Sequence, residues 1–244
     1  SAIPGPSSRT RKYEHDRYRS MPRHMQRHMQ RIGLTQRVEV IQGPTGPAER
    51  RDALDQRWHG LFAELGALAV PLPNGGVPAA ALIDELGLNA IVLTGGNNVA
   101  EAPHGVSGAA NVAPERDRLE RDMIATCRTR GVPLLGVCRG MQMINVALGG
   151  HLERTSGHAG VRHAVSLSGN DHWPENWDVN SYHDVSIPLA SLAPSLRCLA
   201  RADSGDVEAF VHLDDSCHGI MWHPEREAPF RAEDLAYLKQ VLEL

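Results

Sequence analysis

The heptapeptide GVCRGMQ at positions 136–142 constrains the fold of this chain more than any other segment. An apolar run at 132–137 leads into it, and Met141, Ile144 and Leu148 follow at helical spacing. Glycines at both ends of the turn let a strand reverse sharply into a helix, so the residue between them projects outward. The segment therefore predicts a strand, a tight turn and a helix, with a cysteine at the turn.

Cys138 is positioned to be reactive. A thiol at a helix N-terminus faces unpaired backbone N–H groups and the positive end of the helix dipole, which favour the thiolate. The alternative is a small buried hydrophobe, the usual fate of a free cysteine. The two flanking glycines favour a nucleophile, because they give the geometry of the nucleophile elbow in hydrolases.

Composition indicates a single globular domain. The 244 residues are 41% hydrophobic and contain no apolar run long enough to span a membrane. Aromatic residues are sparse, which suits a parallel sheet covered by helices. The four cysteines show no C-x-x-C spacing, so neither a zinc cluster nor a disulfide framework is expected. A reducing cytoplasm and no membrane association are the corresponding expectations.

The first 30 residues differ from the rest of the chain. Residues 1–31 hold eight Lys or Arg and two acidic residues, although the whole chain carries a net charge of −4. We interpret residues 1–30 as a basic, disordered extension and residues 31–244 as one domain, with nucleic-acid binding by the extension as the weaker alternative. His24 and His28 stand at i, i+4 but lack a third ligand, so no metal site is predicted.

Periodicity predicts alternating strands and helices, and hence an α/β fold with a mostly parallel sheet covered by helices on both faces. The long polar loop at 97–114 follows a strand and is a candidate substrate loop. The expected strands are 31–35, 67–72, 89–94, 132–137, 151–155, 162–167, 178–187, 196–201, 207–213 and 219–222, and the expected helices are 49–65, 79–86, 115–130 and 233–242, with a helix also following Cys138.

The tripeptide His223-Pro224-Glu225 is the second chemical signal. On an extended segment, side chains two apart point the same way, so Glu225 can orient the imidazole of His223. Pro224 argues against a helix at this point. Together with Cys138, the tripeptide completes a nucleophile, a base and an orienting carboxylate; an ordinary strand end is the alternative.

These motifs, with Leu93-Thr94-Gly95-Gly96-Asn97, resemble the class I glutamine amidotransferases, and within them the γ-glutamyl hydrolase-like branch, peptidase C26. The resemblance covers about residues 31–230. It implies a flavodoxin-like α/β fold, a Cys-His-Glu triad, a γ-glutamyl thioester intermediate and no cofactor. The implied substrate is a small γ-glutamyl compound, with no nucleic-acid partner.

The resemblance assigns roles by position. Cys138 would be the nucleophile, His223 the general base and then acid, and Glu225 its orienting group. The remaining implied site residues are the oxyanion donors Arg139 N–H and Gly96 N–H, or Gly95 N–H in place of the latter, Gln142 for the glutamyl group, and Asn180, Ser181, Tyr182 and His183 for the glutamyl α-amino and α-carboxylate groups.

A narrower resemblance, in ERRDALD at 49–55, VNSYH at 179–183 and MWHPERE at 221–227, points to enzymes that hydrolyse γ-glutamyl-CDP-amidate for capsule phosphoramidate biosynthesis. Arg50 and Arg51, expected at a helix start, could then contact a diphosphate, or could simply be solvated. The alternatives are a γ-glutamyl-polyamine or γ-glutamyl-aminobutyrate hydrolase, a glutaminase subunit that passes ammonia to a synthetase, and a non-catalytic binding relative.

Overall fold

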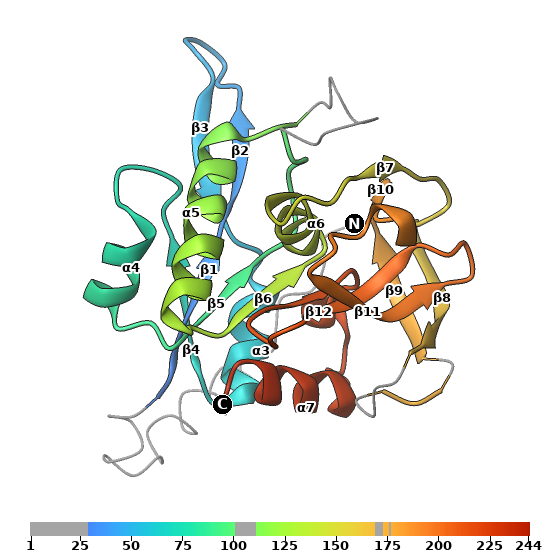
Figure 1. Cartoon of the computed structure of the whole chain (residues 1–244). Helices are drawn as coiled ribbons and strands as arrows, with labels where there is room; N and C mark the ends of the chain where they lie inside the picture. Colours follow the sequence, from blue (N-terminus) through green and yellow to red (C-terminus); the bar gives the residue numbers. More distant parts are fainter. Residues whose placement is uncertain (1–28, 101–110, 169–172, 176) are drawn as a thin grey trace.

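A nine-stranded mixed sheet forms the centre of the molecule in the computed structural model, which describes residues 29–100, 111–168, 173–175 and 177–244 (Figure 1). The first five strands in the spatial order below run parallel to their neighbours, and the other four are antiparallel. The order is β4 (Leu68–Leu72), β1 (Arg31–Thr35), β5 (Ala90–Leu93), β6 (Leu134–Val137), β13 (His218–Ile220), β12 (Val207–His212), β11 (Leu196–Ala202), β8 (Ala159–Leu167) and β9 (Trp177–Tyr182).

Helices connect the parallel strands. The chain moves from β1 outward to β4 through α3 (Arg57–Leu65), then back across β1 to β5 and β6 through α4 (Ala79–Leu86) and α5 (Pro114–Arg130). Right-handed crossovers put α3 on one face of the sheet and α4 and α5 on the other. The order β4-β1-β5-β6-β13 is that of flavodoxin-like folds, so the predicted α/β, flavodoxin-like class is confirmed.

Two further helices complete the fold. Helix α6 (Arg139–Ala147) follows β6 directly, as the sequence predicted. The last helix, α7 (Ala232–Val241), lies beside β13, where the Tyr237 hydroxyl is 3.2 Å from His218 Nδ1. None of the helices in the described ranges combines the length and apolar character that a membrane span requires.

The helix predicted at 49–65 is partly wrong. Its first residues form β3 (Glu49–Ala53), which pairs along its whole length with β2 (Arg37–Ile41), a strand that the sequence analysis missed. The intervening Gly- and Pro-rich loop reverses the chain, and the strand pairing satisfies the backbone groups of the hairpin. The helix begins only at Arg57, where Asp55 Oδ1 accepts a hydrogen bond from the Arg57 N–H.

The strand predicted at 178–187 is interrupted. The chain leaves the large sheet after β9. It then forms a second strand, β10 (Val185–Ser186), which pairs with β7 (Glu153–Arg154) in a separate two-stranded sheet. His183 lies at the break, and its Nδ1 is 3.0 Å from the Val185 carbonyl oxygen. Two 3₁₀ turns, η1 (Leu189–Ser191) and η2 (Pro224–Arg226), follow later in the chain.

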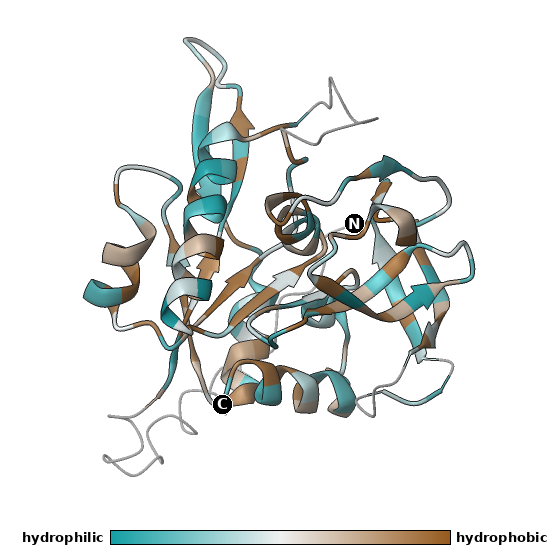
Figure 2. Ribbon diagram, in the orientation of Figure 1, coloured by the Kyte–Doolittle hydropathy of each residue, from teal (hydrophilic) through white to brown (hydrophobic). Residues whose placement is uncertain are grey.

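The core lies on both faces of the parallel strands. All residues of β5 and β6 are buried, and Figure 2 shows hydrophobic residues concentrated on these central strands. Cys127, on the inner stripe of α5, is fully buried, which confirms its predicted place in the core. Of the candidate substrate loop at 97–114, residues 101–110 lie outside the described ranges.

Candidate active site

Cys138 occupies a strained turn between β6 and α6. Its φ of 53° and ψ of −109° lie outside the regions that a non-glycine residue ordinarily adopts. Glycines make the turn possible by allowing close backbone approach: a Cβ on Gly140 would lie 2.0 Å from the Leu93 carbonyl oxygen, and one on Gly136 would lie 2.5 Å from the Met141 nitrogen. The two glycines therefore let α6 begin directly against β5 and β6, as the spacing predicted.

The Cys138 thiol and the His223 imidazole line the same cavity, and each shifts the pKa of the other. The chain brings them together because β6 and β13 are parallel neighbours, so the residues that follow them meet at one edge of the sheet. Burial raises the pKa of the Cys138 thiol, but the charge of His223 and the hydrogen bond to it outweigh this and leave the pKa below its ordinary value. The pair is therefore set to hold a thiolate and an imidazolium.

Glu225 orients His223. Its Oε1 lies 2.7 Å from His223 Nδ1, which leaves Nε2 for the thiol, and both side chains are almost completely buried. Burial lowers the pKa of His223, but the charges of Glu225 and Cys138 raise it to about 10. The expected extended segment is wrong in detail: Pro224–Arg226 is a 3₁₀ turn, which accepts proline at its first position, and the turn brings the two side chains together.

Asn180 holds the backbone of His223, and Gly95 lies against its imidazole ring. Asn180 Oδ1 accepts a hydrogen bond from the His223 N–H at 2.9 Å, and Asn180 Nδ2 donates to the His223 carbonyl at 2.9 Å. Gly95 lies against the ring, since a Cβ there would be 2.7 Å from His223 Cε1. Both residues therefore contact His223 directly.

The pair opens onto a cavity of about 700 Å³, within the usual range for small-molecule sites. The cavity lies at the carboxyl ends of β1, β5 and β6, next to the switch point between β1 and β5 where ligands bind in such sheets. It is lined by Arg37, Val38, Glu39, Val40, Ile41, Gly96, Asn97, Asn98, Asn111, Cys138, Arg139, Gln142, Tyr182, His183, Asp184, Val185, His223 and Arg226.

Besides Arg139, four of the residues proposed to contact substrate or oxyanion line this cavity: Gly96, Gln142, Tyr182 and His183. Gln142 Nε2 donates to the Val185 carbonyl at 2.9 Å and so also ties α6 to the opposite wall. Arg139 lines the cavity as well, and its N–H faces the Cys138 sulfur.

The other proposed contacts lie elsewhere. Ser181 Oγ donates to the His158 carbonyl, away from the cavity. Arg50 and Arg51 are on β3 instead of a helix start, and they form ion pairs with Glu115 and Glu49. None of the three lines the cavity.

The structure adds two arginines that the sequence analysis missed. Arg37, on β2, lines the cavity and pairs with Glu39 at 2.9 Å, and Arg226 stacks over the Tyr182 ring at 4.2 Å. Arg226 directly follows the His-Pro-Glu motif and could have been found from it. Arg37 could not, because its position depends on the unrecognised hairpin.

A buried cluster of two arginines and two carboxylates supports the turn. Glu120 accepts a hydrogen bond from Arg116 Nε at 2.8 Å and pairs with Arg139, and Asp117 also pairs with Arg139. Arg116 in turn donates to the carbonyl oxygens of Thr94 and Gly95. The cluster links α5, the start of α6 and the end of β5 without a net charge.

Comparisons with known proteins agree with this geometry. The family model described as Peptidase C26 matches residues 31–225. A γ-glutamyl-CDP-amidate hydrolase of Campylobacter jejuni is 32% identical over 80% of this chain and 90% of its own length. Among solved structures, a glutamine amidotransferase from Thermotoga maritima (TM-score 0.60, 20% identity, 88% of this chain and 85% of that chain) and one from Methylobacillus flagellatus (TM-score 0.56, 19% identity, 86% and 76%) share the fold.

Proposed function

Since this chain belongs to the peptidase C26 family, we propose that it is a cysteine hydrolase that cleaves a γ-glutamyl amide bond and releases glutamate. The observation that carries the proposal is the Cys138–His223–Glu225 arrangement, which opens onto the 700 Å³ cavity. A nucleophile, a base and an orienting carboxylate in hydrogen-bonding contact are what covalent acyl transfer requires.

In the first step, the Cys138 thiolate attacks the γ-carbonyl carbon of the substrate. The oxyanion that forms would accept hydrogen bonds from the N–H groups of Arg139 and Gly96, and the N-terminus of α6 adds its positive dipole. Protonated His223 gives its proton to the leaving nitrogen, the C–N bond breaks, and the γ-glutamyl thioester remains on Cys138.

In the second step, neutral His223 takes a proton from a water molecule, and the resulting hydroxide attacks the thioester carbon. Collapse of this second tetrahedral intermediate breaks the C–S bond and releases glutamate, which restores the thiolate and the imidazolium. Glu225 holds Nδ1–H in both steps and stabilises the charged ring.

We propose γ-glutamyl-CDP-amidate as the substrate, which would give cytidine diphosphoramidate for capsule modification. The relative of that name and the two arginines at the cavity, Arg37 and Arg226, support this choice, because guanidinium groups bind phosphate oxygens in a forked geometry. All four cysteines are free thiols, in keeping with a cytoplasmic enzyme.

The experiment is a panel of substrates tested for glutamate release: glutamine, γ-glutamyl-putrescine, γ-glutamyl-aminobutyrate and γ-glutamyl-CDP-amidate. We expect the highest kcat/KM for the nucleotide and no turnover of any substrate by Cys138→Ala. Turnover by Cys138→Ala would refute the mechanism. A preference for glutamine that grows when a synthetase is added would instead indicate an ammonia-supplying subunit.

Two arginine variants test the diphosphate contact. Arg37→Ala should raise KM for the nucleotide substrate about tenfold and leave glutamine turnover unchanged, since one charge-assisted contact contributes about 1.5 kcal/mol. Arg51→Ala is the matched control, because Arg51 is on the partner strand of the same hairpin and pairs with Glu49 outside the cavity. Equal effects of the two substitutions would remove Arg37 from the site.

A further inference from the structure

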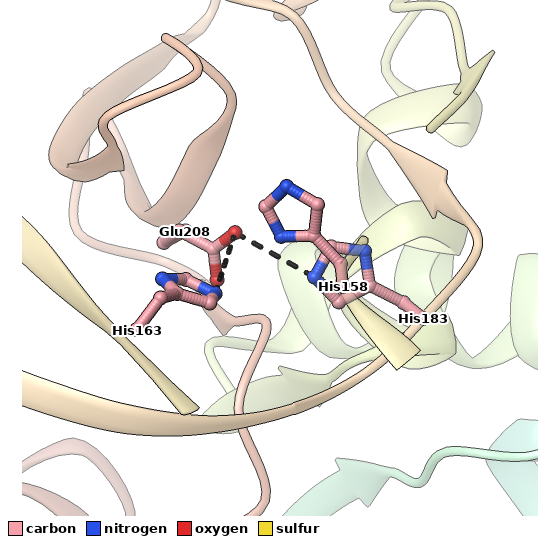
Figure 3. A group of neighbouring side chains, drawn as sticks. All are labelled: His158, His163, His183 and Glu208. Atoms are coloured by element: carbon pink, nitrogen blue, oxygen red, sulfur yellow. Dashed lines mark ion pairs between the residues drawn. The ribbon is translucent and has the colours of Figure 1, made fainter. Parts of the chain in front are cut away.

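Three histidines and one glutamate converge beside the catalytic cavity. His158 precedes β8, His163 lies within β8, His183 follows β9, and Glu208 is on β12. Their potential ligand atoms all lie within 4.8 Å of one another, and Figure 3 shows the four side chains directed toward a common point. His183 also lines the catalytic cavity, so the cluster lies immediately behind one wall of the active site.

A β-bulge brings two of these histidines to the same face. His158 and His163 are five residues apart, so a regular strand would direct them to opposite faces. Gly160 has a φ of +74° and is left out of the pairing, since Ala159 lies opposite Tyr182 and Val161 opposite Ser181. One extra residue in the strand restores the even spacing. Sequence spacing alone therefore concealed the cluster.

Glu208 is a buried carboxylate whose nearest polar groups are two histidines. Its side chain is 1% exposed, and within the described part of the chain neither of its oxygens accepts a hydrogen bond. The nearest groups are His183 Nε2 at 3.6 Å and His163 Nε2 at 3.9 Å, both of which also lack hydrogen-bond partners there. A buried carboxylate needs a compensating positive charge, which either a protonated histidine or a bound cation at this point would supply.

The hydrogen bonds on the far side of the rings fix the protonation of two histidines. His183 Nδ1 is 3.0 Å from the Val185 carbonyl oxygen, and His163 Nδ1 is 3.2 Å from that of Ala164. A carbonyl only accepts, so each Nδ1 carries a proton, and Nε2 is the ring atom that faces Glu208. Metal-binding histidines use the same arrangement, with the outer N–H held by a carbonyl.

We propose that His158, His163, His183 and Glu208 bind one Zn²⁺ ion. Three imidazole nitrogens and one carboxylate oxygen suit tetrahedral zinc, whose bonds of about 2.0–2.2 Å place neighbouring ligand atoms about 3.4 Å apart. The separations of 3.6 and 3.9 Å are already near this value, and the widest separation of 4.8 Å must close by a little over 1 Å. Four protein ligands leave no open position, so the site is structural.

The ion would stabilise the wall of the cavity that contains Asp184 and Val185. It would join β8, β12 and the chain break between β9 and β10, where His183 precedes Asp184 and Val185 of the cavity lining. Gln142 holds the Val185 carbonyl from the opposite side, so the wall would be fixed between the ion and α6. This role is independent of the bond that the enzyme cleaves.

The test measures zinc retention by the full chain. The parent protein is Cys138→Ser/His24→Ala/His28→Ala, so that neither the thiol of Cys138 nor the His24–His28 pair can compete for the ion. After chelator treatment, one equivalent of Zn²⁺ and gel filtration, we expect about one zinc per chain by elemental analysis. Co²⁺ in its place should give the intense visible absorption of a four-coordinate site.

Glu208→Gln and His163→Ala, each made in this parent, should lower zinc retention at least tenfold, whereas the control His59→Ala, at an exposed position on α3, should retain it. Circular dichroism identifies any variant that fails to fold. In addition, Zn²⁺ should raise the melting temperature of the parent and leave the melting temperatures of Glu208→Gln and His163→Ala unchanged. A parent that retains no zinc, as a simple His183–Glu208 ion pair would give, refutes the proposal, and so does equal retention by Glu208→Gln and His163→Ala.

Discussion

Asn180 gives the sharpest test of how His223, the proposed catalytic histidine, is held. Its amide oxygen accepts from the His223 N–H, and its amide nitrogen donates both to the His223 carbonyl at 2.9 Å and to Glu227 Oε1 at 2.8 Å. The buried amide group therefore binds both the N–H and the carbonyl group of the His223 backbone. Family resemblance implies a substrate contact for Asn180, and from these hydrogen bonds we predict that it positions His223.

The loss of stability in Asn180→Ala follows from the buried polar groups that lose their hydrogen-bond partner. The His223 N–H and carbonyl both lose a partner in a buried region, and each loss costs about 1–3 kcal/mol. The total is about 2–6 kcal/mol, which for a chain of this size lowers the melting temperature by roughly 5–20 °C. A displacement of the imidazole by about 1 Å should in addition lower kcat about 10²-fold.

Asn180→Asp separates the two halves of the amide. The aspartate keeps an oxygen for the His223 N–H, but its second oxygen meets the His223 carbonyl and the Glu227 carboxylate, where a donor is needed. We therefore expect it to be at least as damaging as Asn180→Ala. Glutamate release and thermal unfolding measure both effects. A raised KM with unchanged kcat and melting temperature would refute this reasoning and return Asn180 to the substrate.

Three further predictions follow from the same geometry. Burial raises the pKa of Cys127 and Cys217 to about 12 and the pKa of Cys138 is lowered, so iodoacetamide at pH 7 should alkylate Cys138 at least tenfold faster; equal labelling by peptide mapping would contradict this. Gly140→Ala, whose Cβ would meet the Leu93 carbonyl, should cost about 3 kcal/mol or more in urea unfolding, whereas Gly75→Ala, with open space around it, should be nearly neutral. Burial raises the pKa of Asp234 to about 6, so protonated Asp234 adds to the free energy of unfolding below pH 4, and this contribution is lost as the pH rises through 6. Asp234→Asn should therefore remove about 3 kcal/mol from the decrease in the free energy of unfolding between pH 4 and pH 7. An unchanged dependence of that free energy on pH would contradict the assignment.

The sequence predicted the turn at Cys138 well because the turn is determined locally. Residues 136–142 contain the strand end, the glycines and the helix start within a single segment, and no distant pairing can change what they require. The parallel strands were equally clear, since β5 and β6 are apolar throughout and buried on both faces. Such local patterns predict the structure correctly because the tertiary packing favours the same conformation.

The walls of the cavity could not be predicted in the same way. The hairpin of β2 and β3 exists because two polar segments pair with each other, and ERRDA at 49–53 has no apolar alternation that identifies a strand. The cluster around Glu208 depends on one bulge at Gly160, which changes the face of every residue before it. Both features are set by register between distant segments, which residue periodicity does not report.

The two proposed oxyanion donors depend on a single buried carboxylate. Glu120 pairs with Arg139, whose N–H is one donor, and it also holds Arg116, which fixes the carbonyl oxygens of Thr94 and Gly95 just before the second donor at Gly96. Thr35 Oγ1 donates to the same carboxylate at 2.7 Å and accepts from the Thr94 N–H, so the end of β1 also belongs to the hydrogen-bonded network around Glu120. Removing one member of such a buried ion pair costs about 3–5 kcal/mol, because the remaining charge has no partner. The cluster is thus costly to assemble, yet it gives two hydrogen-bond donors on separate elements one fixed relative position, which is the preorganisation that stabilising a developing oxyanion requires.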